Sequence, residues 1–480
     1  MHKKYCRCCC GHAAINSHGN GILSGKRRIA ALTMAFIMLF VMPIAVFAEA
    51  GVGMGASDTA YSSDGVDFDV LSAVATDPEI SHASSAYLYN IENDRVLYEY
   101  KAKDRVYPAS TVKIMTAIVA FEKFADALET KITITQEMLD EASGNRIGFS
   151  AGEIVTVEQM LYCMLVNSAN DAAIILAYAS YGGIEQFVSM MNEKANWLGA
   201  FDTFYTNPTG MHSDAMVTTA RDTAVIAKYA YSIPGLIDMT STPKYVMPET
   251  NMSDYRNIYN RNCMVSKYYS VDYYYGRAVG MNAGATTQGG YSLCGVAEDA
   301  ENGLTYIAVA LGCTESDGAF YNYVNVRNMF DWAFSSYGYT TVLSSSKMIC
   351  EMRVRLSSTN DYVTLVPERD ISVYLPTSIV PERDLTYSYN TYEEAADAPI
   401  EAGQDAGSIT VMYGDEILGS CALITTSTVT RSEFLYFLSR VQRFTDSRFF
   451  RATVVSAVVL SIAYVLVRAS MRERKLRRRR

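Results

Sequence analysis

The pattern of apolar and polar positions divides the chain into segments of different secondary structure. Two short runs, 86–89 and 96–100, flank an Asn-Asp pair and predict a β-hairpin. Apolar positions at helical spacing then dominate from 110 to about 231. Within that region Thr156 and Gln159 have the spacing of a capping box, which predicts the start of a helix.

Strand patterns return in the second half of the chain. Residues 279–284, 291–296 and 304–311 are apolar runs of strand length, and an Asn-Gly dipeptide predicts the turn between the last two. From about 340 to 425 short alternating runs recur, which indicates a separate small all-β domain. We therefore expect a mixed α/β (α+β) domain followed by a β-rich domain.

Both ends of the chain combine apolar and basic residues. Residues 29–47 are apolar, follow three basic residues and precede a small-residue cleavage site at Ala48, which is typical of a secretory signal. The apolar stretch is long, so an uncleaved anchor is the alternative. Residues 453–467 carry no charge, and the tail at 468–480 has eight basic residues and one acid. Such a tail stays in the cytoplasm, which predicts an exported chain anchored at its C-terminus.

Charge and cysteine usage narrow the possible partners. The formal net charge is −10, and residues 29–467 carry 27 basic and 50 acidic side chains. An acidic exported domain repels a phosphate backbone, so we expect no nucleic-acid partner. The six cysteines of this part are scattered singly, which favours buried free thiols over a disulfide framework. No Cys/His cluster has zinc spacing, so we expect no metal.

The segment PASTVKIMTAIVAF, 108–121, carries the first candidate chemistry. Lys113 and Thr116 are the only polar residues from 112 to 121, which predicts a helix buried nearly all round. A buried lysine loses its proton readily, and Ser110 lies on the same face near the helix N-terminus. Such a pair is an activated nucleophile, and the alternative is a lysine whose head group reaches solvent.

The segment LVNSANDAA, 165–173, carries the second group of candidate catalytic residues. We expect Ser168 and Asn170 on a tight connection between two apolar helices. There a hydroxyl can relay a proton and an amide can hold a substrate carbonyl, although an ordinary turn has the same composition. A Ser-His-Asp triad is the competing arrangement and would need His212, which lies in what looks like a structural loop.

Together the two motifs resemble those of the D-alanyl-D-alanine carboxypeptidases, the low-molecular-weight penicillin-binding proteins. YPASTVKIMTA, SANDAA, FVSMMNEKANWLG and FYTNPTGM are similar to family blocks in family order, and AVGMNAGATTQGGYSLC occupies the place of the third motif. The resemblance implies a serine β-lactamase/DD-peptidase-like domain, with an antiparallel sheet flanked by helices and an all-helical lobe. The expected organisation is a leader and signal at 1–48, a flexible linker at 49–80, the catalytic domain at 81–339, the β-rich domain at 340–430, an amphipathic helix at 431–452, a transmembrane segment at 453–467 and a basic cytoplasmic tail at 468–480.

The resemblance also implies a role for each matched residue. Ser110 would attack the peptide carbonyl between two D-alanines, and Lys113 would take its proton. Ser168 would pass a proton to the leaving amine, and Asn170 would orient the substrate. Backbone N–H groups of Ser110 and Ala285 would form the oxyanion hole. The implied substrate is the D-Ala-D-Ala end of a peptidoglycan stem peptide, with β-lactams as covalent inhibitors and no cofactor.

The third motif departs from the family pattern Lys-Thr/Ser-Gly, because the aligned residues are Asn282, Ala283 and Gly284. In the family the lysine and the hydroxyl grip the terminal carboxylate of the substrate, whereas Asn282 is neutral and Ala283 has no polar group. Losing a charged partner costs ~1.5–3 kcal/mol, roughly ten- to a hundredfold in rate or binding. Arg277 should point to the opposite face of the strand, whereas Thr286, Thr287 or a neighbouring loop could restore the grip.

Two interpretations follow from this mixture. In the first, the chain is a working but altered serine-type carboxypeptidase of cell-wall biogenesis, because all four positions of the first two motifs are intact. In the second, it is a catalytically impaired homologue that binds cell-wall peptide or a protein partner without turnover. A β-lactamase is a third alternative and lacks an obvious general-base glutamate. Tyrosines between 268 and 275 could line a sugar or peptide groove, or simply pack a loop.

Overall fold

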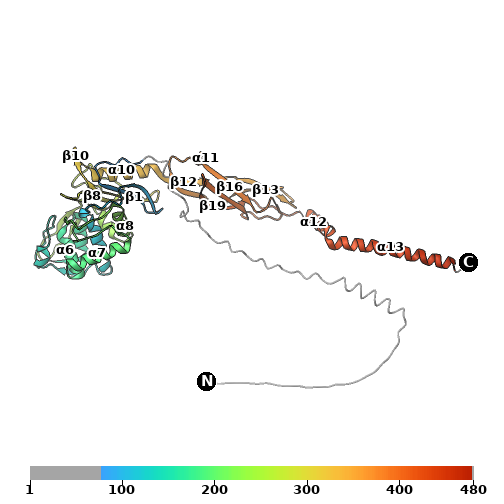
Figure 1. Ribbon diagram of the computed structural model, residues 1–480, viewed down its shortest axis with the longest axis horizontal. Helices are drawn as coiled ribbons and strands as arrows, with labels where there is room; N and C mark the ends of the chain where they lie inside the picture. The colour runs from blue at the N-terminus through green and yellow to red at the C-terminus, as the bar shows by residue number, and fades with distance from the viewer. Residues whose placement is uncertain (1–76, 478–480) are drawn as a thin grey trace, which may run out of the picture. The chain divides into compact units, whose positions relative to one another are not determined.

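The computed structural model describes residues 77–477 (Figure 1). The predicted leader and signal, with most of the predicted linker, fall at 1–76 and lie outside the described residues, as does the end of the basic tail at 478–480. The described part contains a sheet with helices, a helical lobe, a β-rich domain and two C-terminal helices.

A five-stranded antiparallel sheet in the order β2-β1-β9-β8-β7 forms the framework of the first domain. The predicted hairpin is confirmed as β1 (Ser85–Asn90) and β2 (Arg95–Tyr100). The three later predicted strands are confirmed as β7 (Ala278–Thr286), β8 (Gly290–Asp299) and β9 (Leu304–Cys313). Because β1 pairs with β9, the two ends of the domain meet in the centre of the sheet, and β7 is left at an edge.

Helices cover both faces of this sheet. Residues along β9 belong alternately to two hydrophobic clusters, as expected for a strand buried on both faces. On one face α10 (Tyr321–Ser336) packs against β8 and β9. On the other, α8 (Ala220–Ser232) packs against β1 and β9, and α9 (Leu236–Ser241) packs against β7. The edge strand β7 therefore borders the helical side of the domain.

The helical lobe surrounds α3 (Val112–Lys123), which contacts α5 (Val157–Asn167), α6 (Asn170–Tyr181) and α7 (Ile184–Leu198). Every residue of α3 from Val112 to Ala120 is buried, Lys113 included, which confirms the predicted all-round burial. The capping box at the start of α5 is also confirmed. The lobe is completed by β3 (Lys131–Thr133), α4 (Gln136–Asp140), β4 (Ile154–Thr156), β5 (Lys244–Met247) and β6 (Arg256–Tyr259).

The β-rich domain has its own hydrophobic core, which includes Leu365, Ile409 and Leu423. Its main sheet has the order β16-β18-β19-β14-β13-β17, and β12 pairs with β15 in a smaller sheet. Its elements are β12 (Tyr337–Leu343), β13 (Cys350–Arg355), β14 (Tyr362–Pro367), β15 (Ile371–Pro376), α11 (Pro381–Asp384), β16 (Leu385–Thr391), β17 (Ala395–Asp397), β18 (Asp405–Tyr413) and β19 (Glu416–Thr425).

Two helices follow the β-rich domain. Helix α12 (Glu433–Asp446) has no buried residue, and its apolar side chains, such as Phe434 and Phe437, are exposed. Helix α13 (Arg448–Arg477) is long and apolar enough to cross a membrane over Arg448–Arg472. The predicted span lies within this segment. An exposed apolar face on α12 beside such a helix fits the predicted amphipathic helix at a membrane surface.

The cysteines of the described part are all free. Five of them are buried and Cys350 is half-buried, so the expectation of free, mostly buried thiols is confirmed. Burial raises the pKa of the Cys294 thiol to about 12, which leaves it unreactive.

Candidate active site

Ser110 lies in a 3-10 turn, Ala109–Thr111, that follows Pro108 and leads directly into α3. Ala109 has a φ of +50°, a left-handed conformation that a residue with a Cβ adopts at a cost. The loop at Gly210 presses on this turn, because a Cβ on Gly210 would lie 2.1 Å from the carbonyl oxygen of Ala109. Packing from this loop therefore fixes the turn that presents the serine.

Lys113 and Ser110 are in direct contact. The Nζ of Lys113 lies 3.2 Å from the Oγ of Ser110 and donates a hydrogen bond of 2.6 Å to the carbonyl oxygen of Thr209. The lysine is completely buried. Burial, together with the like charge of Arg261, lowers the pKa of Lys113 to about 7. A neutral amine beside a half-buried serine hydroxyl can remove its proton.

His212 is not the basic neighbour of Ser110. Its Nε2 lies 3.1 Å from the Oδ1 of Asp214 in the same loop, and its ring packs edge-on against Tyr107 at 4.7 Å. The serine therefore has a lysine as its basic neighbour, and the alternative of a Ser-His-Asp triad receives no support.

Ser168 and Asn170 lie on the tight connection that the sequence predicts. Ser168 ends α5 in a left-handed conformation, and Asn170 is the first residue of α6. The Nδ2 of Asn170 donates to the carbonyl oxygen of Ser143 at 2.6 Å, and the Nδ2 of Asn145 donates to that of Ser168 at 3.2 Å. Because α5 and α6 both pack on α3, this connection shares its support with the turn of Ser110.

The third segment of the site is the edge strand β7. A Cβ on Gly284 would lie 2.4 Å from the Cβ of Ser110 and 2.7 Å from its Oγ, so only glycine allows this approach. Ala285, the residue expected to supply an oxyanion-hole N–H, is exposed beside it. Thr286 accepts a hydrogen bond of 2.9 Å from the N–H of Gly289, so part of its hydrogen-bonding capacity is already used in the turn to β8.

Asn282 stands where the family pattern has a lysine, and it is 2% exposed. Its Oδ1 is buried without a hydrogen-bond partner among the described residues. Its strand neighbour Ala283 lines a cavity together with Gly284 and Ala285. The strand has thus kept its path past Ser110 while the polar groups at these two positions differ from the pattern.

Arg277 and Arg261 are two cations that precede this strand in sequence. Arg277 forms an ion pair of 3.2 Å with Asp299 and stacks 4.4 Å above the ring of Phe334, which agrees with its predicted orientation away from the site. Arg261 instead is exposed and lines the cavity together with Ala283. Sequence reasoning missed Arg261. The sequence offered one indication, an arginine between Asn260 and Asn262. The structure buries both asparagines and leaves the arginine exposed.

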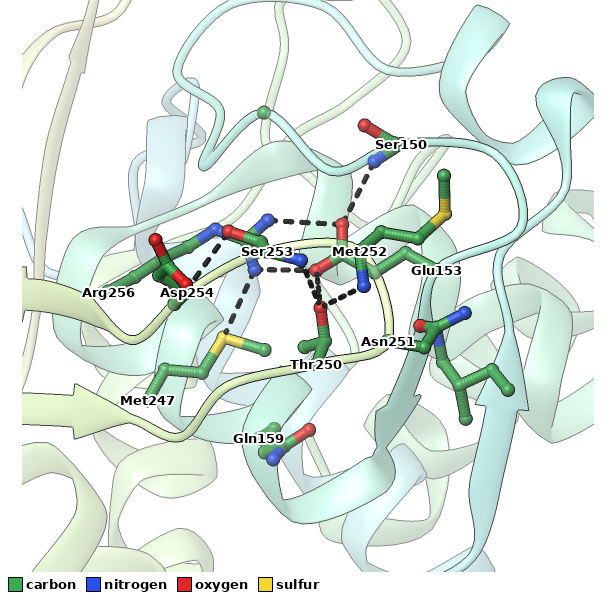
Figure 2. Close-up of polar contacts among 12 residues, drawn as sticks. Ser150, Glu153, Gln159, Met247, Thr250, Asn251, Met252, Ser253, Asp254 and Arg256 are labelled. Atoms are coloured by element: carbon green, nitrogen blue, oxygen red, sulfur yellow. Dashed lines mark hydrogen bonds and ion pairs between the residues drawn. The ribbon is translucent and has the colours of Figure 1, made fainter.

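A buried ion pair holds the loop before α5 to strand β6 (Figure 2). Glu153, fully buried, accepts hydrogen bonds of 2.6 and 3.1 Å from Arg256 and one of 2.8 Å from Thr250. Burial alone raises the pKa of Glu153, but these bonds and the N–H of Ser150 bring it below its ordinary value. Arg256 begins β6, whose end lies two residues before Arg261, so the pair also fixes the segment that carries the arginine.

The described residues include no group of three His, Cys, Asp or Glu side chains that could hold a metal. A serine in contact with a buried lysine, between an antiparallel sheet and a helical lobe, defines a serine acyl-enzyme with the penicillin-recognising fold.

Comparison with known proteins identifies the family. Residues 72–315 match the model of the D-alanyl-D-alanine carboxypeptidase family, and residues 337–431 match that of the penicillin-binding protein 5 C-terminal domain. The first match covers more than half of the chain, so the chain belongs to the D-alanyl-D-alanine carboxypeptidase family, and its function is in cell-wall peptidoglycan processing. The predicted fold, a DD-peptidase-like domain followed by a β-rich domain, is confirmed.

Individual proteins of known family are similar to this chain over most of their own length. The chain is 26% identical to D-alanyl-D-alanine carboxypeptidase DacF of Bacillus subtilis over 75% of this chain and 90% of that protein. It is 31% identical to DacB2 of Mycobacterium tuberculosis over 48% of this chain and 74% of that protein. Penicillin-binding protein 5 of Haemophilus influenzae has the same fold, with a TM-score of 0.53, 23% identity and coverage of 74% of this chain and 100% of that one. The C-terminal apolar helix fits the membrane anchor of such proteins.

Proposed function

We propose that the chain is a working serine-type D-Ala-D-Ala carboxypeptidase that removes the terminal D-alanine of peptidoglycan stem peptides and grips the substrate carboxylate in an altered way. One observation carries the proposal: a fully buried Lys113, with a pKa of about 7, lies 3.2 Å from the Oγ of Ser110. A protein that only bound peptide would gain nothing from a buried amine whose pKa is lowered in this way.

The proposed reaction gives each of these groups the role that the family resemblance implies. Neutral Lys113 takes the proton of Ser110 as its Oγ attacks the carbonyl carbon of the penultimate D-alanine. The N–H groups of Ser110 and Ala285 stabilise the oxyanion, and Asn170 orients the peptide. Protonated Lys113 returns this proton through Ser168 to the departing amine as the C–N bond breaks, which leaves Lys113 neutral again. Water then attacks the ester, its proton goes to Lys113, and Ser110 is regenerated.

Recognition of the terminal carboxylate has to differ from the family pattern. Asn282 is neutral and Ala283 has no hydroxyl, so the strand itself supplies no charge. Arg261 supports a replacement, because it is exposed, lines the cavity beside Gly284 and is close enough for its charge to affect Lys113. A guanidinium pairs well with a carboxylate, and we assign this task to Arg261.

The proposed location follows from the C-terminal helix. With α13 as the anchor and the basic tail in the cytoplasm, the catalytic domain would lie on the extracytoplasmic face of the cell membrane. Substrate is present on that face. β-Lactams, which resemble the D-Ala-D-Ala terminus, are the expected covalent inhibitors.

The full chain, purified in detergent, should be incubated with a fluorescent penicillin beside a Ser110→Ala control. We expect covalent labelling of the chain and none of the control. Release of D-alanine from a peptide ending in D-Ala-D-Ala should then be measured, with Arg261→Gln expected to raise KM.

The second interpretation, a homologue without turnover, is favoured by one observation: the amide oxygen of Asn282 is buried without a hydrogen-bond partner among the described residues. It predicts no labelling and no D-alanine release. In that case the double variant Asn282→Lys with Ala283→Thr decides the matter. Labelling of this double variant would indicate an enzyme that lost its activity through the third motif. If the double variant is not labelled either, the proposed activity is overturned.

A further inference from the structure

The cavity beside β7 is much larger than a terminal D-alanine requires. It has a volume of about 350 Å³ and is lined by Arg261, Ala283 and Gly284 together with a group of aromatic rings. A cavity of this size is in the range that binds complete small ligands, whereas the methyl group of D-alanine would leave most of it empty. The rings come from Tyr269, Tyr273, Tyr291, Phe320 and Tyr323.

Three of the aromatic rings present apolar faces because their hydroxyls are hydrogen-bonded to neighbouring groups. The hydroxyl oxygen of Tyr273 accepts from the N–H of Phe320 at 2.9 Å, and the hydroxyl of Tyr291 donates to Glu315 at 3.2 Å. The hydroxyl of Tyr323 donates to the carbonyl oxygen of Arg261 at 3.3 Å. Tyr273 and Tyr323 stack at 4.9 Å, so this wall is flat and rigid. Such a wall suits another aromatic ring.

Charge decides which part of the substrate enters this cavity. The departing residue carries the C-terminal carboxylate, and Arg261 is the cation in the lining. A second cavity of about 600 Å³ meets the first at Ala285 and Tyr291 and continues past the C-terminal end of β7. It is lined by polar groups such as Thr286 and Gln288 and by the carboxylate of Glu315. A carboxylate is repelled there. The stem peptide therefore extends along the second cavity, and the departing residue lies in the first.

We propose that the aromatic cavity beside β7 accepts the side chain of a bulky aromatic D-residue at the end of the stem peptide, so that the chain removes such a residue in preference to D-alanine. The inference rests on the proposed carboxypeptidase function and names its preferred substrate. Ala283 contributes to it, since only a methyl group separates the strand from the cavity at this position. The bond broken is the amide between the penultimate D-alanine and the aromatic residue, and water is the co-reactant.

The test uses the full chain in detergent and two synthetic peptides that differ only in the last residue, D-alanine or D-phenylalanine. We expect kcat/KM for the D-phenylalanine peptide to exceed that for the D-alanine peptide at least about tenfold. Ser270, on the rim of the same cavity, offers a matched pair of variants. Ser270→Trp fills the cavity and should remove the preference, whereas Ser270→Ala leaves the cavity open and should retain it.

Labelling by fluorescent penicillin separates the two proposals. If the chain is labelled and hydrolyses both peptides equally, or prefers D-alanine, the aromatic-residue inference is overturned and the carboxypeptidase function stands. If the chain is labelled but hydrolyses neither peptide, the concentration of each peptide that protects Ser110 from labelling is measured instead of hydrolysis. Protection by the D-phenylalanine peptide at a tenfold lower concentration than the D-alanine peptide supports the inference. Equal protection overturns it. If Ser110 is labelled neither in the chain nor in the double variant at 282 and 283, both proposals fail.

Discussion

The turn of Ser110 and the strand β7 face each other across the same site, yet they differ in environment. Lys113, which follows the turn, is fully buried and donates a hydrogen bond to Thr209. A substitution there would disturb the packing of the surrounding side chains. Ala283 and Ala285 on β7 are half-buried or exposed and line cavities. The difference teaches that the chemistry of such an enzyme and its recognition of substrate can change separately, since only the first depends on a dry, closely packed core.

The largest effect should come from Lys113→Met, which keeps the length and burial of the side chain and removes the base. We expect the rate of penicillin labelling to fall by about 10²–10⁴-fold. Lys194→Met is the control, because Lys194 pairs with Glu122 on the surface and should leave labelling unchanged. A Lys113→Met variant that is labelled at the normal rate would show that another group activates the serine.

Glu153→Ala tests the scaffold on which both regions depend. Removing the fully buried carboxylate leaves its donors, among them the half-buried Arg256, without their partner. This should lower the free energy of unfolding by about 3–5 kcal/mol, measured by urea denaturation of the full chain in detergent. Asp202→Ala breaks an exposed ion pair with Arg105 and should cost below about 1 kcal/mol. Equal losses would show that the buried pair contributes no more than a surface one.

The same pair gives a pH dependence. Glu153 has a pKa below its ordinary value of 4.5 in the folded chain. Its stabilising contribution is therefore present above that ordinary value and is lost as the pH falls through the lower, folded-state pKa. The wild-type chain should lose this part of its stability in acid, whereas Glu153→Ala should not.

Asn282→Lys tests the strand alone. Restoring a cation at this position should raise kcat/KM for D-alanine release by roughly ten- to a hundredfold, since charged hydrogen bonds are worth ~1.5–3 kcal/mol. Arg277→Gln is the control, because Arg277 is engaged by Asp299 and should not affect release. A decrease in Asn282→Lys would mean that the buried amide, not a charge, is what this site now uses.

The smallest expected effect is a pH dependence that involves both the turn of Ser110 and the residues near β7. Penicillin labelling should rise about tenfold between pH 6 and pH 8 as Lys113, with a pKa of about 7, loses its proton. Arg261→Gln removes a like charge that lowers this pKa, so the midpoint of the profile should move to higher pH. An unmoved midpoint would show that Arg261 acts on substrate only.

The sequence predicted the parts of this site that depend on neighbours along the chain. Ser110 with Lys113, and Ser168 with Asn170, follow from helical spacing and from the composition of one short segment each. Arg261 and the buried pair of Glu153 with Arg256 could not be predicted, because they depend on residues about a hundred or more positions apart. Ser110 lies near the N-terminus of the helix, as predicted, but in a separate 3-10 turn that precedes α3.

Gly284 sets a limit on how this strand can diversify. The space that any side chain at this position would need is already occupied by the side chain of Ser110. Substitutions at Asn282 and Ala283 alter what the site recognises, but a substitution at Gly284 pushes the strand and the nucleophile apart. The strand thus has two positions open to new substrate preferences and one that is closed for as long as a serine performs the reaction.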